Sequence, residues 1–350
     1  MAPAMTTTPV PSAAVLRYRA VRFHRIGDPL DVLQLDELVP QPLRKGEVRI
    51  RVEAFALNRA DWLFCRGQHY SAPNLPSRIG SECAGVVVEL GPEVDEALLG
   101  KQVCTVPFDN SEYGVHGEYA VVPAAYLAPW PAGLSAVEAA STWMQYLTAY
   151  FALVEVGKTG PGDHVLIPAA SSSAGLAAIQ LARILGATVI ATSRGASKLP
   201  SITAAGANHA LALDTTPDLA ARINEISGNR GVGLVYDPVG GPFLAAYVGA
   251  LARGAKILIY GLLSGATTEL DLVPLVRKAA SIHPYSMFNH VIDPAQLGRG
   301  IEFIMRAIRS GVRPVIDSQY DLHRIDDAYR RLDTYAQVGK IVVSCTPPSA

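Results

Sequence analysis

The stretch that decides the fold runs from 164 to 192 and reads His-Val-Leu-Ile-Pro-Ala-Ala-Ser-Ser-Ser-Ala-Gly-Leu-Ala-Ala-Ile-Gln-Leu-Ala-Arg-Ile-Leu-Gly-Ala-Thr-Val-Ile-Ala-Thr. The apolar run at 165–167 is typical of a strand buried on both faces of a parallel sheet. Apolar residues then recur at helical spacing from Leu176, Gly186 ends the helix, and a β-rich run resumes at Thr188. The stretch therefore predicts strand, tight turn, helix and strand, the repeating unit of an α/β domain.

The turn between the first strand and the helix is a candidate phosphate site, because free N–H groups and the positive end of the helix dipole converge there. The usual dinucleotide fingerprint is G-x-G-x-x-G, and here only its third glycine is present. Small residues still let a pyrophosphate approach the backbone, and the serines add hydroxyl donors. We therefore expect a dinucleotide at Ala170, Ser171, Ser172, Ser173, Ala174 and Gly175. The alternative is an ordinary βαβ crossover without a ligand.

The end of the second strand indicates which dinucleotide is bound. A site that prefers NAD usually has an acid about 20 residues after the fingerprint, where it binds the ribose 2′-hydroxyl. This chain has no acid there before Asp214, and instead offers Ser193, Arg194 and Lys198. A hydroxyl, a guanidinium and an ammonium suit a 2′-phosphate, so the sequence favours NADPH over NADH. The alternative is a solvated basic turn.

Composition excludes several classes of partner. The chain has 350 residues and a formal net charge of −1, without basic runs, so we expect no nucleic acid partner. No apolar run is long enough for a membrane span, and we expect no membrane association. Residues 1–14 resemble a disordered leader without an apolar secretion segment, which predicts a cytoplasmic protein, although the lack of acids leaves a transit peptide open. The cysteines form no C-x-x-C pair and are expected to be buried free thiols.

Short strands with turn punctuation precede the α/β part. The segment 47–54 alternates with period two, 83–90 is a second strand, and the β-rich module ends near 119–122. A helix is expected over 135–156, with Ser135 as N-cap and Glu138 completing a capping box.

The rest of the chain is expected to contain both strands and helices. Buried strands are expected at 209–213, 233–237 and 255–261, helices at 298–310 and 325–332, and a last strand at 340–344.

The order of elements and several local motifs resemble the medium-chain dehydrogenase/reductase superfamily, in its zinc-less quinone oxidoreductase and enoyl reductase branch. The resemblance covers about 21–344, and its motifs lie at 57–62, 66–70, 80–86, 144–150, 237–241 and 339–343. It implies an α/β fold with a GroES-like β-rich catalytic domain (15–145 and 290–350) and a doubly wound Rossmann domain (146–289). It also implies NADPH as cofactor and a homodimer joined at sheet edges, with 255–260 and the strand near Ile282 as candidate edges.

Departures from the zinc-containing branch bear on the chemistry. Asn58 stands where those enzymes have a catalytic cysteine, and Gly80-Ser81-Glu82 replaces Gly-His-Glu. A catalytic zinc needs about three protein ligands, so we expect no metal. Without a Lewis acid, the acceptor should be an electron-poor small molecule activated by its own conjugation, a quinone or a conjugated C=C bond. Reduction of an enone or enoyl thioester is the runner-up, and a non-catalytic NADPH-binding protein and a zinc alcohol dehydrogenase are the further alternatives.

The resemblance also assigns catalytic residues. Asn58 and Thr148 match residues placed by the nicotinamide, and Tyr70 matches a tyrosine proposed as proton donor to carbon. Asp61 is expected to fix the local turn. The alternatives are an asparagine in a β-turn, a threonine bonded to its own helical turn, and a tyrosine that lines an apolar pocket.

Five more residues are expected at the cofactor because they follow buried strands or match family positions: Val239, Gly240, Tyr260, Gly261 and Phe288. Tyr285 and Met287 are expected beside Phe288, with ordinary core packing as the alternative. Lys340 matches a family lysine near the active site, and its alternative is an exposed lysine before an edge strand.

Overall fold

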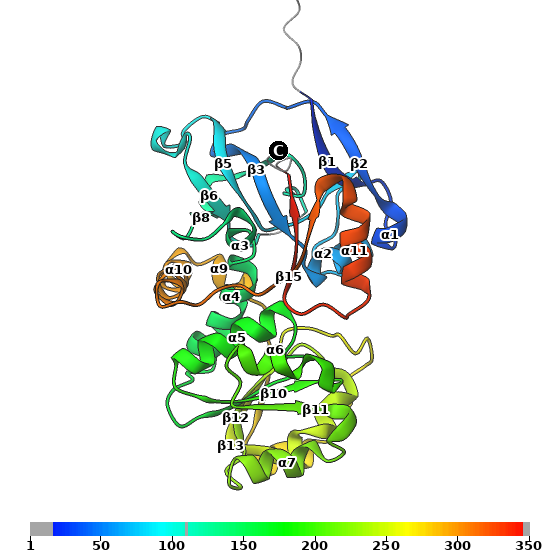
Figure 1. Cartoon of the computed structure of the whole chain (residues 1–350), viewed down its shortest axis with the longest axis vertical. Helices are drawn as coiled ribbons and strands as arrows, with labels where there is room; N and C mark the ends of the chain where they lie inside the picture. The colour runs from blue at the N-terminus through cyan, green and yellow to red at the C-terminus, as the bar shows by residue number, and fades with distance from the viewer. Residues whose placement is uncertain (1–16, 109–110, 346–350) are drawn as a thin grey trace, which may run out of the picture.

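The structure is a computed structural model that describes residues 17–108 and 111–345, so the expected leader at 1–14 lies outside the described residues. Figure 1 shows two lobes, one built around mixed β-sheets and the other around a parallel sheet with helices. The first and last parts of the described chain share the β-rich lobe, and α4 and α10 lie between this lobe and the parallel sheet (Figure 1).

The second lobe contains a six-stranded sheet in the order β11-β10-β9-β12-β13-β14, and all its strand pairs are parallel. The chain order therefore reverses between β9 and β12, as in a doubly wound nucleotide-binding fold. The predicted α/β class with a doubly wound domain is confirmed. Its strands are β9 (His164–Ile167), β10 (Thr188–Ser193), β11 (His209–Ala212), β12 (Val232–Asp237), β13 (Leu251–Ile259) and β14 (Ser281–Pro284).

Helices cover both faces of this sheet. Val165 and Ile167 of β9 pack in the core cluster that contains α5, whereas Leu166 between them packs in the cluster that contains α7 and α8. This alternation explains why β9 is apolar at every position from Val165 on. The helices are α5 (Ser173–Ile184), α6 (Leu199–Ala204), α7 (Leu219–Ile226) and α8 (Leu272–Lys278), followed by α9 (Phe288–Val291) and α10 (Pro294–Arg309).

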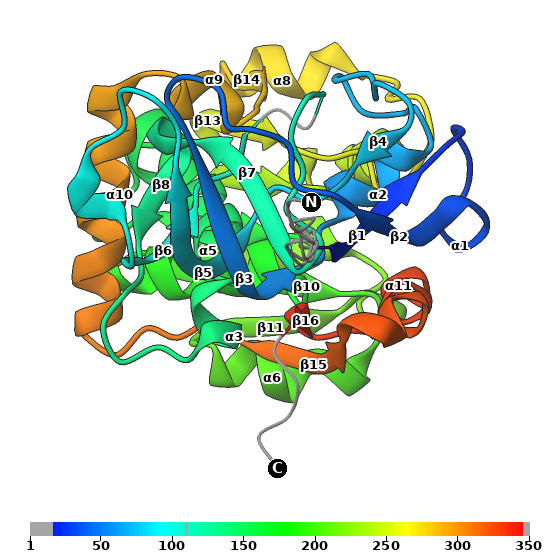
Figure 2. The ribbon, with the colours of Figure 1, turned by 90° about the horizontal axis from the view of Figure 1, so that it is seen from above.

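The β-rich lobe has a seven-stranded sheet, β15-β16-β3-β5-β6-β8 with β7 on β3, and a three-stranded sheet, β2-β1-β4. Figure 2 shows these strands in front of the parallel sheet, with the β1–β2 pair to one side. The strands are β1 (Tyr18–Phe23), β2 (Leu33–Leu38), β3 (Glu47–Ala56), β4 (Ser77–Arg78), β5 (Cys83–Leu90), β6 (Gln102–Thr105), β7 (Tyr119–Pro123), β8 (Leu127–Pro129), β15 (Ile316–Asp321) and β16 (Lys340–Ser344). The helices of this lobe are α1 (Pro29–Val32), α2 (Arg59–Cys65), α3 (Ala136–Ala139) and α11 (Ile325–Asp333), and α4 (Trp143–Tyr150) lies between the lobes.

The single helix expected over 135–156 is wrong, although its capping box at Ser135 and Glu138 is confirmed. The structure has α3, α4 and a π-helical segment (Phe151–Val156) instead. The helix is interrupted where the hydroxyls of Ser141 and Thr142 donate hydrogen bonds to the carbonyls of Val137 and Glu138. Such back-bonding competes with the regular helix.

Two more expectations need correction. The helix expected to begin near 298 begins at Pro294, because Asp293 caps it and proline is well tolerated in the first turn. The run 255–260 is not a sheet edge, since it lies in β13 between β12 and β14. The strand near Ile282 is β14, which forms the edge as expected.

Candidate active site

The candidate site is a pocket of about 820 Å³ between the two lobes. It lies at the carboxyl ends of β9, β10 and β12, where the strand order of the parallel sheet reverses. Ligands of open α/β sheets bind at such switch points. The other side of the pocket is formed by the start of α2 and by the segment 332–341.

The turn after β9 has the geometry of a phosphate site. Ser172 caps α5, and its Oγ accepts a hydrogen bond of 3.1 Å from the Gly175 N–H. A Cβ on Gly175 would lie 2.7 Å from Cα of Ala170, so only glycine allows this close approach of helix and turn. The pocket is lined by Ser171, Ser172 and Ser173. The other three predicted residues, Ala170, Ala174 and Gly175, do not line it, and Ala170 and Gly175 form the close contact that supports the turn.

The basic turn after β10 faces the same pocket, since Ser193, Arg194 and Lys198 all line it. Lys198 Nζ donates to the carbonyl oxygens of Tyr335 over 2.7 Å and Gln337 over 3.1 Å. Partial burial lowers the pKa of the Lys198 ammonium. The structure thus brings these three residues, predicted to bind the 2′-phosphate, to the same pocket as the serine turn.

Arg59 is a third cation in the pocket that sequence reasoning did not identify. It is the first residue of α2, and its Nη2 donates to the Leu332 carbonyl over 2.7 Å. Its Nη1 is buried and has no hydrogen-bond partner among the described residues. Since the described residues that line the pocket include no Asp or Glu, the three cations have no carboxylate beside them in the pocket wall. The available signal was the position of Arg59 directly after Asn58.

Asn58 lines the pocket, but its side-chain amide is hydrogen-bonded to residues that do not line it. Nδ2 donates to Glu82 Oε1 over 3.1 Å and to the Ala56 carbonyl over 3.4 Å, and Oδ1 accepts from Lys340 Nζ over 2.6 Å. Lys340 also forms a short ion pair with Glu82, and both side chains are 1% exposed. The alternative of an exposed lysine before an edge strand is therefore wrong, because Lys340 is buried and β16 lies between β15 and β3. Lys340 also does not line the pocket, so it does not lie at the predicted cofactor position.

The donors around Asn58 do not suit zinc. The Glu82 carboxylate already has an ammonium partner, and the neighbouring Ser81 offers a buried hydroxyl without a hydrogen bond. Among residues 17–108 and 111–345, no group of three or more His, Cys, Asp or Glu side chains could hold a metal ion. A zinc site would need such a set.

Asp61 fixes the start of α2, as expected from the sequence, because its Oδ2 accepts the Asn58 N–H over 2.8 Å. Burial raises the pKa of the Asp61 carboxyl to about 7. His116 Nε2 lies 3.9 Å from Asp61 Oδ2, and burial lowers the pKa of this imidazole to about 3. Beneath Asn58 there is thus a carboxyl group that titrates near neutral pH beside a neutral imidazole.

The other two predicted catalytic residues lie outside the pocket lining. Tyr70 is 66% exposed, with its ring centroid 3.9 Å from that of His69 and 5.5 Å from that of Phe288. Thr148 Oγ1 donates over 2.5 Å to the Met144 carbonyl, which is the bond to its own helical turn considered as the alternative. Tyr285 and Met287 are buried in the core, while Phe288 is partly buried and does not line the pocket.

Of the predicted residues after β12 and β13, Val239 lines the pocket. Gly240, Tyr260 and Gly261 do not line it. Gly240 donates its N–H to Asp237 at a φ of 61°, and a Cβ on Gly261 would lie 2.8 Å from the Pro238 carbonyl oxygen. These glycines allow the two strand ends to approach each other closely.

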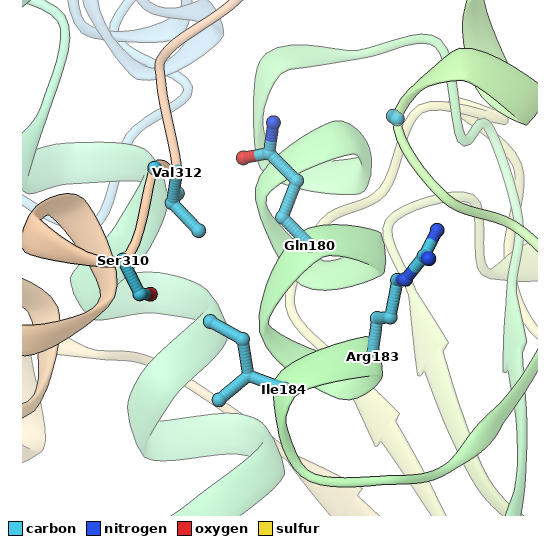
Figure 3. A pocket seen from close by; sticks show the side chains of 7 residues that line it. Gln180, Arg183, Ile184, Ser310 and Val312 are labelled. Atoms are coloured by element: carbon cyan, nitrogen blue, oxygen red, sulfur yellow. The ribbon is translucent and has the colours of Figure 1, made fainter.

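A second pocket, of about 390 Å³, lies on the surface between α5 and the segment 310–312 (Figure 3). Gln180, Arg183 and Ile184 project from the helix on one side, opposite Ser310 and Val312 (Figure 3). The Gln180 amide is already bonded, since it accepts from Tyr146 and donates to the Arg313 carbonyl. This surface pocket shares no lining residue with the pocket between the lobes, and we assign it no role.

Comparison with known proteins agrees with this geometry. Residues 44–132 match the alcohol dehydrogenase GroES-like domain, and residues 174–304 match the zinc-binding dehydrogenase family. The chain is 30% identical to quinone oxidoreductase 1 of Escherichia coli over 89% of this chain and 93% of that protein. It is 29% identical to part of a phenolphthiocerol/phthiocerol polyketide synthase of Mycobacterium tuberculosis, over 98% of this chain and 16% of that protein. A structure of E. coli quinone oxidoreductase complexed with NADPH superposes with a TM-score of 0.84 at 28% identity, covering 93% of this chain and all of that one.

The chain therefore belongs to the medium-chain dehydrogenase/reductase superfamily, in its quinone oxidoreductase branch. The expected combination of a GroES-like domain with a Rossmann domain is confirmed. No helix among the described residues is long and apolar enough to cross a membrane.

Proposed function

We propose that this protein is an NADPH-dependent, zinc-independent reductase that transfers hydride to a quinone. The observation that supports the cofactor is the composition of the pocket wall. Arg59, Arg194 and Lys198 line it together with the serine turn, and none of the described lining residues is an acid. Such a wall suits a ligand with several phosphate charges.

The residues present fit NADPH. Ser171, Ser172 and Ser173 at the start of α5 would hold the pyrophosphate, and Ser193, Arg194 and Lys198 would hold the 2′-phosphate. The buried hydroxyl of Thr192, which also lines the pocket, has no partner among the described residues. Bound NADPH would supply the hydride. The similarity to a quinone oxidoreductase that has been crystallised with NADPH supports this assignment.

The role proposed for Asn58 is to orient the pocket wall rather than to transfer a proton. Both ends of its amide are engaged, one by Glu82 and the other by Lys340. A quinone suits this site because conjugation activates it without a Lewis acid, and because its reduced oxygen atoms can take protons from solvent. The similarity to quinone oxidoreductase 1 supports a quinone as the acceptor.

A conjugated alkene, as an enone or enoyl thioester, is the alternative acceptor. The similarity to a stretch of a polyketide synthase favours it. This reaction needs a proton on carbon, for which Tyr70 is the proposed donor. The exposed ring of Tyr70 beside Phe288 is available only if substrate extends beyond the pocket lining.

The test is to mix the purified protein with NADPH and either a simple quinone or a conjugated enone, and to follow the reduced nicotinamide by absorbance and the products by mass. Hydroquinone formation supports our proposal, and a saturated ketone supports the alternative. Tyr70→Phe should slow alkene reduction much more than quinone reduction if Tyr70 is the donor. Stabilisation by NADPH without turnover of either acceptor would instead indicate a non-catalytic NADPH-binding protein.

We also propose a homodimer in which β14 pairs with its copy across a two-fold axis. β14 is an edge strand, and on α8, which precedes it in the chain, Leu272, Val273 and Val276 are exposed apolar side chains. A strand whose outer side is unpaired and a neighbouring apolar helix face together favour association with a second copy. Location in the cytoplasm remains a prediction from the sequence.

A further inference from the structure

Tyr335 contacts all three cations of the pocket wall. The Arg59 guanidinium lies over its ring at 4.1 Å from the centroid, and that of Arg194 lies over it at 5.8 Å. Its backbone carbonyl accepts from Lys198 Nζ over 2.7 Å and from Arg194 Nη2 over 3.4 Å. Arg59 belongs to the β-rich lobe and the other two cations to the nucleotide-binding lobe, so this one residue joins the lobes at the pocket.

These contacts are unusual for a cluster of cations. Like charges in one pocket repel each other, and an acid normally compensates them. No Asp or Glu is among the described residues that line this pocket, and the charges of Asp317 and Asp333 act on Lys198 and Arg59 from outside the lining. The negative face of an aromatic ring attracts a guanidinium, and a carbonyl oxygen accepts from an ammonium, so Tyr335 supplies both kinds of partner.

The backbone of Tyr335 is also specialised. Its φ is 53°, a left-handed backbone conformation that residues other than glycine rarely adopt. Tyr335 is 41% exposed, so core packing does not explain why a tyrosine stands there. The conformation places the Tyr335 carbonyl at Lys198 while the ring remains beside the two arginines.

We propose that Tyr335 is a positioning residue for cofactor binding. It holds Arg194 and Lys198 at the pocket wall, where they would receive the 2′-phosphate, and it connects them to Arg59 of the other lobe. This inference rests on the proposed NADPH-dependent function, and it adds a residue that determines the preference for a 2′-phosphate.

The test is to measure the affinities of 2′,5′-ADP and 5′-AMP by calorimetry, because these two ligands differ in the 2′-phosphate and need no turnover. Tyr335→Leu should weaken 2′,5′-ADP binding about tenfold, as expected for the loss of two cation–π contacts, and leave 5′-AMP binding nearly unchanged. Tyr335→Phe keeps the ring and should bind both ligands as the wild type does. Tyr320→Leu is the matched control, because Tyr320 also lies under an arginine, Arg324, but does not line the pocket.

The outcomes separate the two claims. If the wild type binds neither 2′,5′-ADP nor NADPH, the proposed function fails. If the wild type binds 2′,5′-ADP and Tyr335→Leu binds it equally well, or if Tyr335→Phe loses as much affinity as Tyr335→Leu, the role of the ring is refuted. Should Tyr335→Leu not fold, Tyr335→Gly removes the same ring and accepts a φ of 53° without strain, and it should show the same selective loss.

Discussion

The Lys340 ammonium donates a hydrogen bond to Oδ1 of Asn58 over 2.6 Å, although the two residues are 282 positions apart in sequence. The same ammonium forms the buried ion pair with Glu82. In this chain a lysine side chain therefore supplies the positive charge beside Asn58 and Glu82. This arrangement fixes the amide of Asn58 at the pocket wall without a metal ligand set.

The first prediction concerns this buried pair. Lys340→Met should lower the free energy of unfolding by about 3–5 kcal/mol, because it leaves the Glu82 carboxylate buried without a countercharge. The double variant Lys340→Met with Glu82→Gln should recover much of the loss, because no buried charge then remains unpaired. Urea unfolding of the three proteins measures the difference. A single variant as stable as the wild type would show that the pair is not closed in solution.

The second prediction uses the carboxyl group of Asp61, whose pKa burial raises from 3.8 to about 7. Between these values the folded protein holds a proton that the unfolded chain releases. The stabilising contribution is thus complete below pH 3.8 and is lost as pH rises to 7. Relative to Asp61→Asn, which cannot ionise, the wild type should lose stability over this range, by at most about 4 kcal/mol at pH 8.

The measurement is urea unfolding of both proteins at several pH values from about 4 to about 8. His116 acts with the opposite sign, since its lowered pKa makes folded protein gain stability as pH rises from about 3 to 6.5. This contribution is present in both proteins and largely cancels in the comparison. The other charges that act on Asp61 are Lys340 and Glu82. A stability difference that does not change with pH would contradict the raised pKa.

The third prediction concerns Gly175. Gly175→Ala would place a Cβ 2.7 Å from the Ala170 backbone, so α5 must shift away from the turn. We expect about 1–3 kcal/mol of lost stability, and an NADPH affinity at least about tenfold lower because the serine turn is displaced. Gly298→Ala in α10 is the control, since nothing lies within 4 Å of the added Cβ, and it should be neutral or stabilising. Equal behaviour of the two variants would refute the role assigned to Gly175.

The fourth prediction tests the basic turn. Lys198→Met should weaken NADPH binding by about tenfold to a hundredfold, the worth of one lost hydrogen bond to a charged group, and should affect NADH much less. Fluorescence titration of the bound nicotinamide measures both constants. A proportional loss for NADH and NADPH would place the 2′-phosphate elsewhere.

Local sequence signals predicted the nucleotide-binding lobe well. The strand at 165–167, the helix after it and the basic turn at 193–198 depend on neighbouring residues, and the structure has them in the expected places. The segment 135–156 was predicted less well because its break depends on hydroxyl bonds to the backbone and on the Glu82 carboxylate, which accepts the Met144 N–H. Periodicity does not contain such contacts.

The site shows the same division. The serine turn and Arg194 follow from local spacing, whereas the burial of Lys340 depends on partners 258 and 282 residues away. Arg59 and Tyr335 were missed because each lies in a different segment and gains its role only where the two meet. The role of a residue that depends on contact between distant segments cannot be predicted from local patterns in one sequence.

The last prediction concerns assembly. If β14 pairs with its copy, the protein should have a mass in light scattering of twice 37.2 kDa, and Val276→Glu should shift it toward the monomer. Val276 is 75% exposed on α8, so the introduced carboxylate should cost the monomer little stability. At a dimer interface the same carboxylate would be buried without a partner. Ile184→Glu, on the exposed end of α5 and away from β14, is the control and should leave the mass unchanged. If Val276→Glu stays a dimer of wild-type stability, the copies meet through another surface and β14 remains an edge strand.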